Sequence, residues 1–244
     1  MQEKNSVIHL DIIKHAICYL ICFGSLYIFA TIFSLVLSFF PTFVALNSNI
    51  QDTIILTIAY GLTFVSIIIY LNNVVLKLIV KQFRNVQNII DGFLYGSALL
   101  VGTIIISSIF SLIGEKLGVA VVPNENEQAI ASSTLAQPVL TALMTVVFAP
   151  FTEEIGYRLG VFGGIHKYNR FAAYAVSSLI FALIHTNFTE SNFVNELLNL
   201  PSYLFAGLWL CFTYERSGSI ATSITAHMTN NAVVLILSLT SNGI

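Results

Sequence analysis

Charged residues are scarce in this chain. Lys, Arg, Asp and Glu together make up 9% of its 244 residues, whereas soluble domains average about 25%. Hydrophobic residues account for 56% of the sequence, and the mean hydropathy is +0.84. This composition excludes an ordinary soluble domain and indicates an integral membrane protein.

Cysteine, aspartate and basic runs are also in short supply. Cys18, Cys22 and Cys211 form no C-x-x-C pair, so we expect them to be small buried apolar residues. The net charge is −2 and no long basic run occurs, so nucleic acid is not expected as a partner. The three aspartates lie at the edges of apolar stretches and no G-x-S-G sequence occurs, which argues against aspartyl and rhomboid-like serine proteases.

Long uncharged stretches predict membrane-spanning helices, since about 20 apolar residues are enough to cross a bilayer. We expect an all-α, polytopic bundle of about seven spans, with room for an eighth in the long first stretch. Residues 1–244 would form a single integral membrane domain. The predicted spans are Ala16–Leu46, Ile54–Leu76, Gly92–Gly114, Pro138–Phe151 or beyond, Phe171–Phe188, Leu198–Tyr214 and Ser219–Leu239.

The basic residues predict the orientation of these spans, because Lys and Arg concentrate in cytoplasmic loops. A cytoplasmic N-terminus places nine of the ten basic residues inside and leaves Lys116 outside. We therefore expect a cytoplasmic N-terminus, the lipid bilayer as a partner, and the plasma membrane of a bacterium as the location. The nine are Lys4, Lys14, Lys77, Lys81, Arg84, Arg158, Lys167, Arg170 and Arg216.

Two connecting regions carry weaker signals. The segment Asn187–Asn199 places four apolar residues on one helical face. It either lies flat on the outer membrane surface or is a plain connector, and a lid over a cavity is a third alternative with less support. His9, His15 and His166 are expected to be solvated or interfacial histidines at the edges of the spans.

Three separate spans carry polar side chains that are costly in hydrocarbon. An ionisable group at the centre of a span costs roughly 2.5 to 3.5 kcal/mol on insertion scales, and such groups usually face a bundle interior or a cavity. Their coincidence in three helices predicts a functional site. The residues are Glu153, Glu154, Arg158, His185, His227 and Asn231.

Helical spacing indicates how these groups relate to one another. Residues four apart share a helix face, so Glu154 neighbours Arg158, and His227 neighbours Asn231. Glu153 points about 100° away from Glu154. One carboxylate can therefore pair with the arginine while the other handles protons, and the spacing leaves open which does which. The His-Asn face could also simply join two helices.

Three ordered motifs resemble a known family. They are Glu153-Glu154-x-x-x-Arg158, Phe181-x-x-x-His185, and His227-x-x-x-Asn231 preceded by Glu215-Arg216-Ser217-Gly218-Ser219-Ile220. Together they resemble the CAAX-protease and bacteriocin-processing family of intramembrane endopeptidases, also called the Abi family. The resemblance covers residues 137–239, which would form the catalytic core. Leu159 stands where the family usually has Gly, and Tyr157 where Phe is commoner.

The resemblance implies a role for each of these residues. Glu153 would be the general base, and His185 would help to orient or deprotonate a water molecule. His227 and Asn231 would stabilise the oxyanion, while Glu154 and Arg158 would form an ion pair that fixes the helix. A metal-free mechanism is favoured, because no H-E-x-x-H motif occurs and Asn is an uncommon zinc ligand. The alternative is a zinc site of Glu153, His185, His227 and Asn231.

The implied substrate is a membrane-associated peptide or protein, such as a prenylated protein or a bacteriocin or signalling-peptide precursor. One alternative is a non-catalytic bacteriocin self-immunity or scaffold protein with the same fold. A second, with less support, is a small transporter in which the buried Glu and His residues relay protons.

Overall fold

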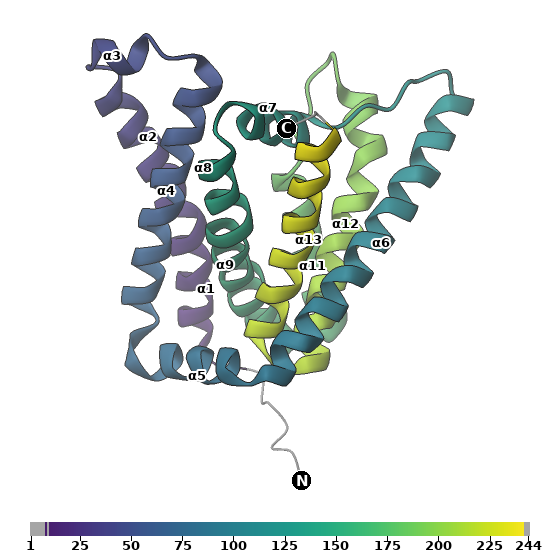
Figure 1. Ribbon diagram of the computed structural model, residues 1–244. Coiled ribbons are helices and arrows are strands. Elements are labelled where there is room, and N and C mark those ends of the chain that lie inside the picture. Colours follow the sequence, from purple (N-terminus) through teal and green to yellow (C-terminus); the bar gives the residue numbers. More distant parts are fainter. Residues whose placement is uncertain (1–7, 9, 242–244) are drawn as a thin grey trace.

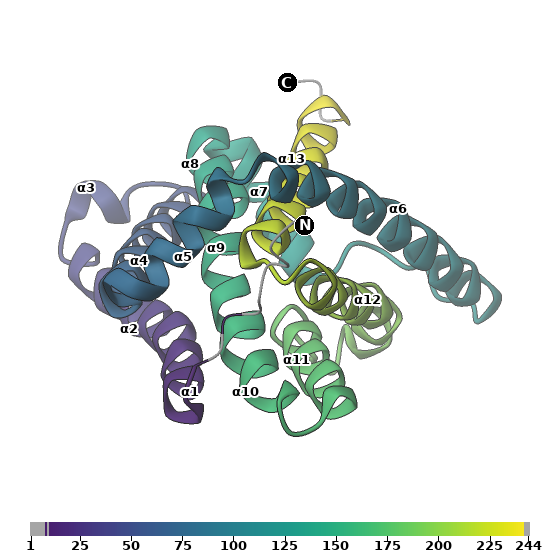
Figure 2. The ribbon, with the colours of Figure 1, turned by 90° about the horizontal axis from the view of Figure 1, so that it is seen from below.

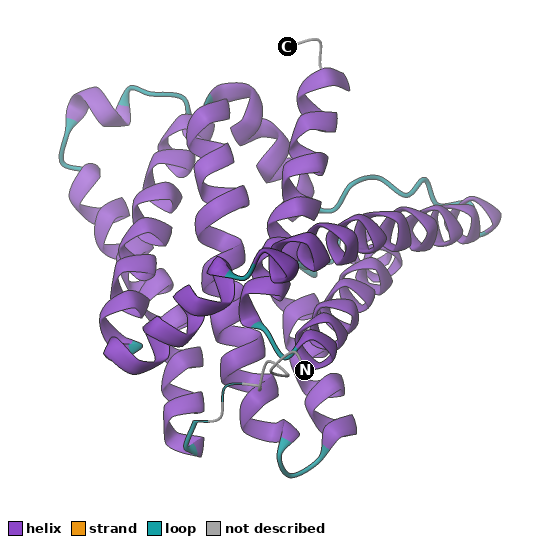
Figure 3. Ribbon diagram, turned by 60° about the horizontal axis from the view of Figure 1, so that its bottom comes forward, coloured by secondary structure: helices purple, strands orange, loops and turns teal. Residues whose placement is uncertain are grey.

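The structure is a computed structural model that describes residue 8 and residues 10–241, with the side chains of residues 72–74 and 241 outside the description. Throughout this described part the chain consists of helices and their connecting loops (Figure 3). Lys4 and His9, for which predictions were made, lie outside the described residues.

The helices follow one another with short connections. In chain order the elements are α1 (Ile12–Leu20), the π-helical segment η1 (Ile21–Ser25), α2 (Leu26–Leu37), α3 (Pro41–Val44), α4 (Ser48–Tyr70), α5 (Asn72–Arg84), α6 (Val86–Lys116), α7 (Glu125–Ala136), α8 (Pro138–Ala142), η2 (Leu143–Phe148), α9 (Ala149–Glu154), η3 (Ile155–Phe162), α10 (Gly163–His166), α11 (Arg170–Ile184), α12 (Phe193–Ser217) and α13 (Ile220–Ser241). Several of these are parts of one continuous helix, as from α8 to α10.

Within the described part of the chain, six helices are long and apolar enough to cross a membrane: Ile12–Leu37, Ser48–Tyr70, Val86–Lys116, Pro138–His166, Phe193–Ser217 and Ile220–Thr240. The remaining predicted span is α11, an apolar helix of 15 residues that ends just before His185. The prediction of an all-helical, polytopic bundle is confirmed, and the chain is an integral membrane protein.

Helix α13 lies at the centre of the bundle. It packs against α6, α12 and the continuous helix from α8 to α10 (Figure 2). Its first two turns, from Ile220 to His227, are buried. To one side α2 packs on α4, and on the other side α6 leans away from its neighbours toward its C-terminal end (Figure 1). Polar residues in the first half of α13 therefore face protein rather than lipid.

Asparagine and glycine mark the ends of several helices. The side chains of Asn47, Asn85, Asn124 and Asn169 accept hydrogen bonds from the first turns of α4, α6, α7 and α11. Each bond satisfies a backbone N–H that has no partner within the helix. Gly218 ends α12 with a φ of 64°, a left-handed conformation that glycine adopts without steric cost.

The structure corrects two expectations about connections and adds one helix that was not predicted. The second predicted span ends at Tyr70, and the chain then turns into α5, which runs across the base of the bundle (Figure 1). The long gap after Lys116 contains α7. A separate surface helix over Asn187–Asn199 is wrong, because α12 already begins at Phe193; only residues 187–192 form a connector.

Basic residues gather at one end of the bundle, which also carries Asp11, Asp91 and Glu215, and most acidic residues lie at the other end. The basic end, where α5 and the start of α1 lie, carries Lys14, Lys77, Lys81, Arg84, Lys167, Arg170 and Arg216. The acidic end, where α3 and α7 lie, carries Asp52, Glu115, Glu125, Glu127, Glu190, Glu196 and one lysine, Lys116. Arg158, which was counted as a cytoplasmic loop residue, is instead completely buried.

This division predicts which end can be labelled from outside the cell. Cysteine introduced by Glu190→Cys at the acidic end should react with a membrane-impermeant maleimide in intact cells, because acidic residues tolerate the outer face. Cysteine from Lys77→Cys at the basic end should react only after the cells are opened. The unmodified chain is the control, since its three cysteines are buried. Labelling of Lys77→Cys alone in intact cells would reverse the orientation.

Candidate active site

The three polar spans bring their carboxylates and imidazoles together inside the bundle. Glu153 Oε2 lies 3.6 Å from His185 Nε2 and 4.0 Å from His227 Nε2. Glu154 Oε1 lies 3.0 Å from His227 Nδ1. Glu153, Glu154 and His227 are buried, and His185 is mostly covered. Side chains from α9, the end of α11 and α13 thus converge, as the sequence predicted.

The tilt of one helix makes this convergence feasible. Straight helices with the predicted boundaries would have placed Glu153, His185 and His227 at different depths. Seen from the basic end, the continuous helix from α8 to α10 runs across the view instead of along it (Figure 2). Its inclination carries α9 past both α13 and α11, and α9 and η3 contact these two helices.

Glu154 is the carboxylate that pairs with the arginine. Its Oε2 lies 3.2 Å from Arg158 Nε, and both side chains are 0% exposed. Ser223 donates a hydrogen bond to the same oxygen, and His227 Nδ1 contacts the other. The Arg158 guanidinium also donates to the Gly207 carbonyl. Both carboxylate oxygens of Glu154 are thus engaged, and these contacts fix the position of the carboxylate.

Glu153 is left much freer than its neighbour. Its Oε2 is buried and has no hydrogen-bond partner among the described residues, although two imidazole Nε2 atoms face it. The Tyr60 side chain on α4 is placed to hydrogen-bond the same carboxyl group. Buried polar atoms without partners are rare and often mark a reactive site or a place for water. Glu153 therefore has the environment of a group that exchanges protons.

The contacts of Nδ1 fix the tautomer of both histidines. His185 Nδ1 lies 2.7 Å from the Phe181 carbonyl oxygen, and His227 Nδ1 lies 3.0 Å from the Glu154 carboxylate. Both partners only accept hydrogen bonds, so Nδ1 carries a proton in each ring. The Nε2 atom of each ring then faces Glu153, where it can accept a hydrogen bond if the ring is neutral and donate one if the ring is protonated. The geometry orients two imidazoles and one carboxyl group around a single point.

Asn231 occupies a different position from the one expected. Its Nδ2 donates a 2.9 Å hydrogen bond to the Thr145 carbonyl. In the π-helical turn of η2, Ala149 N–H bonds to Met144, so Thr145 would need the N–H of the next residue, Pro150, which has none. Asn231 satisfies that orphan carbonyl. The helix-joining interpretation describes this contact, and an oxyanion role for Asn231 stays a prediction.

The two departures from the family pattern are packing residues. The Tyr157 ring packs between Phe23 and Phe181. Leu159 is fully buried, and its carbonyl contacts His15 Nδ1. The expectation that His15 is solvated is therefore wrong, because α1 packs directly against η3 and covers this histidine.

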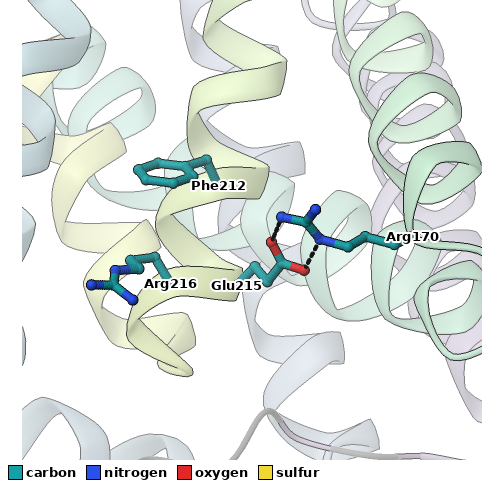
Figure 4. Close-up of a pocket in the computed structure, with 4 residues that line it drawn as sticks. All are labelled: Arg170, Phe212, Glu215 and Arg216. Carbon is teal, nitrogen blue, oxygen red and sulfur yellow. Dashed lines mark hydrogen bonds and ion pairs between the residues drawn. The ribbon is translucent and has the colours of Figure 1, made fainter.

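A second polar cluster lies at the basic end. Glu215 receives a two-pronged ion pair from Arg170, at 2.7 and 2.8 Å (Figure 4). His166 Nε2 and the Tyr174 hydroxyl each lie 2.7 Å from the same carboxylate. His166 is therefore a partner of Glu215 and not simply solvated. Because these contacts join α10 and α11 to α12, the cluster holds helix ends together and contains none of the six predicted site residues.

A metal site does not fit the side chains as they lie. Among the described residues, no group of three His, Cys, Asp or Glu side chains is arranged to hold a metal ion. Glu153, His185 and His227 carry nitrogen and oxygen atoms of the kinds that zinc binds, but Asn231 is engaged with Thr145. The mechanism that this arrangement supports therefore uses no metal ion.

Residues 135–233 match the family model described as type II CAAX prenyl endopeptidase Rce1-like. This region contains all six predicted site residues. YdiL of Bacillus subtilis (strain 168), which carries the provisional name of a membrane peptidase, is 33% identical over 117 residues, or 48% of this chain and 44% of its own length. These matches support the resemblance to the CAAX-protease and bacteriocin-processing family that the sequence motifs predicted.

A second relative extends the similarity beyond the family region. An uncharacterised protein of Mycoplasma capricolum subsp. capricolum is 23% identical over 203 residues, which cover 80% of this chain and 57% of that protein. The chain thus spans about half the length of these curated relatives. No solved structure matches the chain.

The sequence missed two groups that touch the site. Tyr60 follows Thr53 and Thr57 on α4, and this spacing places three polar residues on one face of an otherwise apolar span. That pattern could have indicated, from the sequence alone, that this face of α4 is directed toward the bundle interior. Tyr203 stacks on His185, with ring centroids 5.2 Å apart, but nothing in the sequence near Tyr203 indicates such a contact.

The buried ion pair gives a stability prediction. Arg158→Met should destabilise the folded protein by about 3 kcal/mol, because it leaves the Glu154 charge buried without its partner. The double variant Arg158→Met/Glu154→Gln should recover a large part of that loss. Thermal unfolding in detergent measures both. A double variant no more stable than the single one would show that the pairing is not what stabilises this region.

The Pro150 contact gives a second prediction. Asn231→Leu should cost roughly 1 to 3 kcal/mol by leaving the Thr145 carbonyl unsatisfied. In a Pro150→Ala background the restored backbone N–H can take over that carbonyl, so the same substitution should cost clearly less. A double-mutant cycle of unfolding free energies measures this coupling. Equal costs in both backgrounds would remove the proposed link between Pro150 and Asn231.

Proposed function

We propose that the chain is an intramembrane endopeptidase that hydrolyses a membrane-associated peptide or protein with a water molecule activated by Glu153. The observation that carries the proposal is the buried, unpartnered Glu153 Oε2 facing the Nε2 atoms of His185 and His227. The match of residues 135–233 to the family model supports the same reaction class.

The first chemical step is the attack of water on the scissile carbonyl. Water would bind between Glu153 and His185, and Glu153 would accept its proton as the new carbon–oxygen bond forms. The Nδ1–H of His185 is held by Phe181, so its Nε2 can accept a hydrogen bond from the water and orient it. The product of this step is a tetrahedral intermediate with a negative oxygen.

The second step breaks the carbon–nitrogen bond. Protonated Glu153 would return its proton to the leaving amine, which gives a free amine and a carboxylic acid that loses its proton to solvent on release. His227 would donate from Nε2 to the oxyanion in its doubly protonated form, whose charge the Glu154 carboxylate is placed to balance. Asn231 would serve as a second donor only if its amide left Thr145.

The substrate class follows from the surroundings of the site. The site is buried within apolar helices, so a substrate that is already at the membrane can reach it without crossing bulk water. A prenylated protein, a bacteriocin precursor or a signalling-peptide precursor would satisfy this condition. The bacterial source of both relatives favours a bacterial plasma membrane as the location.

Substitution of the base tests the proposal. In proteoliposomes with a lipidated or amphipathic test peptide, Glu153→Gln should lower the cleavage rate by roughly 10²- to 10⁴-fold, since it removes the general base. Glu190→Gln, at an exposed position of the acidic end, is the matched control and should cleave normally. Unfolding temperatures should show that both variants are folded, and mass spectrometry should locate one cleaved peptide bond.

Three results would separate the alternatives. Full activity of Glu153→Gln would overturn the mechanism. Protection against a bacteriocin that survives in Glu153→Gln, without any cleavage by the unmodified chain, would support the scaffold alternative. Loss of cleavage on adding a chelator, and its return with zinc, would replace the metal-free mechanism by a metal-dependent one.

A further inference from the structure

The place of His185 at the end of α11 leaves its backbone less firmly held than that of a residue inside the helix. His185 is the residue that ends this helix, with φ −90° and ψ 2°, and a loop follows it. Residues at a helix end are held less firmly than those in its interior, because the last carbonyls lack helical partners. A catalytic imidazole must nevertheless stay within about 0.5 Å of its productive position. Something beyond α11 has to hold this residue.

Helix α7 supplies a hold on the backbone of His185. Asn124, the N-cap residue of α7, is fully buried, and its Nδ2 donates a 2.9 Å hydrogen bond to the His185 carbonyl. Its Oδ1 accepts the backbone N–H of Glu127 at 2.9 Å. The same side chain therefore begins α7 and ties that helix to the end of α11.

Tyr203 on α12 supplies a hold on the ring. The imidazole of His185 lies between two aromatic rings: Phe181 at 4.4 Å with a 27° interplanar angle, and Tyr203 at 5.2 Å with 23°. The Tyr203 hydroxyl lies 3.2 Å from Asn124 Oδ1 and 3.2 Å from Glu127 Oε1, so these two acceptors share its single proton. The stacked ring is thus tethered to α7.

The tether is itself braced by a buried carboxylate. Glu196 is 0% exposed, and it accepts the backbone N–H of Glu125 at 3.1 Å and that of Asn187 at 3.3 Å. These bonds fasten the start of α7 and the loop after His185 to α12. Polar groups buried to this extent are stable only while their bonds are kept.

We propose that Tyr203, tethered by Asn124 and Glu127, is a positioning residue that holds the His185 ring against Glu153. The inference rests on the proposed peptidase function. Asn124 and Glu127 precede residue 135, where the match to the family model begins. The positioning device is therefore built partly from a segment outside the family region.

Conservative substitutions separate the hydroxyl from the ring. Tyr203→Phe keeps the stacking ring and removes the tether, so kcat should fall roughly 10-fold with an unchanged KM, because small misplacements of catalytic groups are costly. Glu127→Leu removes one of the two acceptors and should lower kcat by less than Tyr203→Phe does. The double variant should be little worse than Tyr203→Phe alone. Glu127→Gln keeps the acceptor and should cleave normally. Tyr95→Phe, a tyrosine that packs on Trp209 and Phe212, is the matched control.

A measurement on His185 itself makes the test independent of catalysis. The rate at which diethyl pyrocarbonate modifies His185, read by mass spectrometry, should rise several-fold in Tyr203→Phe and Glu127→Leu. It should stay at the level of the unmodified chain in Glu127→Gln and Tyr95→Phe. If the chain cleaves no peptide, the proposed function fails, while these modification rates still test the positioning. Unchanged kcat and unchanged modification rates in Tyr203→Phe and Glu127→Leu would overturn the inference.

Discussion

The buried ion pair between Glu154 and Arg158 is the interaction on which the rest of the site depends. A buried charge in a lipid-embedded core is costly unless it is paired and hydrogen-bonded. Arg158, Ser223 and His227 all bind Glu154, and this gives the two glutamates different environments. Arg158 also lies 5.0 Å from the centroid of Phe181, the ring that stacks on His185. One pair therefore connects α9 with both α13 and α11.

Pro150 contributes by loosening the helix one turn before the glutamates. The π-helical turns on either side of α9 widen the helix, and the missing N–H of Pro150 leaves the Thr145 carbonyl for Asn231 to bind. The local defect thus becomes a link between helices. Irregular backbone inside a membrane is tolerated where protein groups satisfy its hydrogen-bonding atoms. Here Asn231 on α13 satisfies the Thr145 carbonyl.

The sequence predicted the parts of this structure that composition and spacing control. Hydropathy identified the long helices, and the four-residue spacing paired Glu154 with Arg158. The sequence did not predict helices α5 and α7, because both have mixed polarity and are shorter than a membrane span. It also could not place Asn231, whose contact depends on a π-helical turn in another helix. Burial of His15 was missed for the same kind of reason, since the covering residues lie about 145 positions away in the chain.

The site also depends on helices that lie outside the family region. Tyr60 on α4 reaches Glu153, and Asn124 at the start of α7 reaches His185. Both contacts come from segments before residue 135, while the reactive groups themselves follow it. Residues 135–233 supply the carboxylates and imidazoles, so they can keep the same chemistry in different proteins. The helices outside this region can at the same time differ in how they hold these side chains. The helices around the core, more than the core itself, would set the precision of the site in this chain.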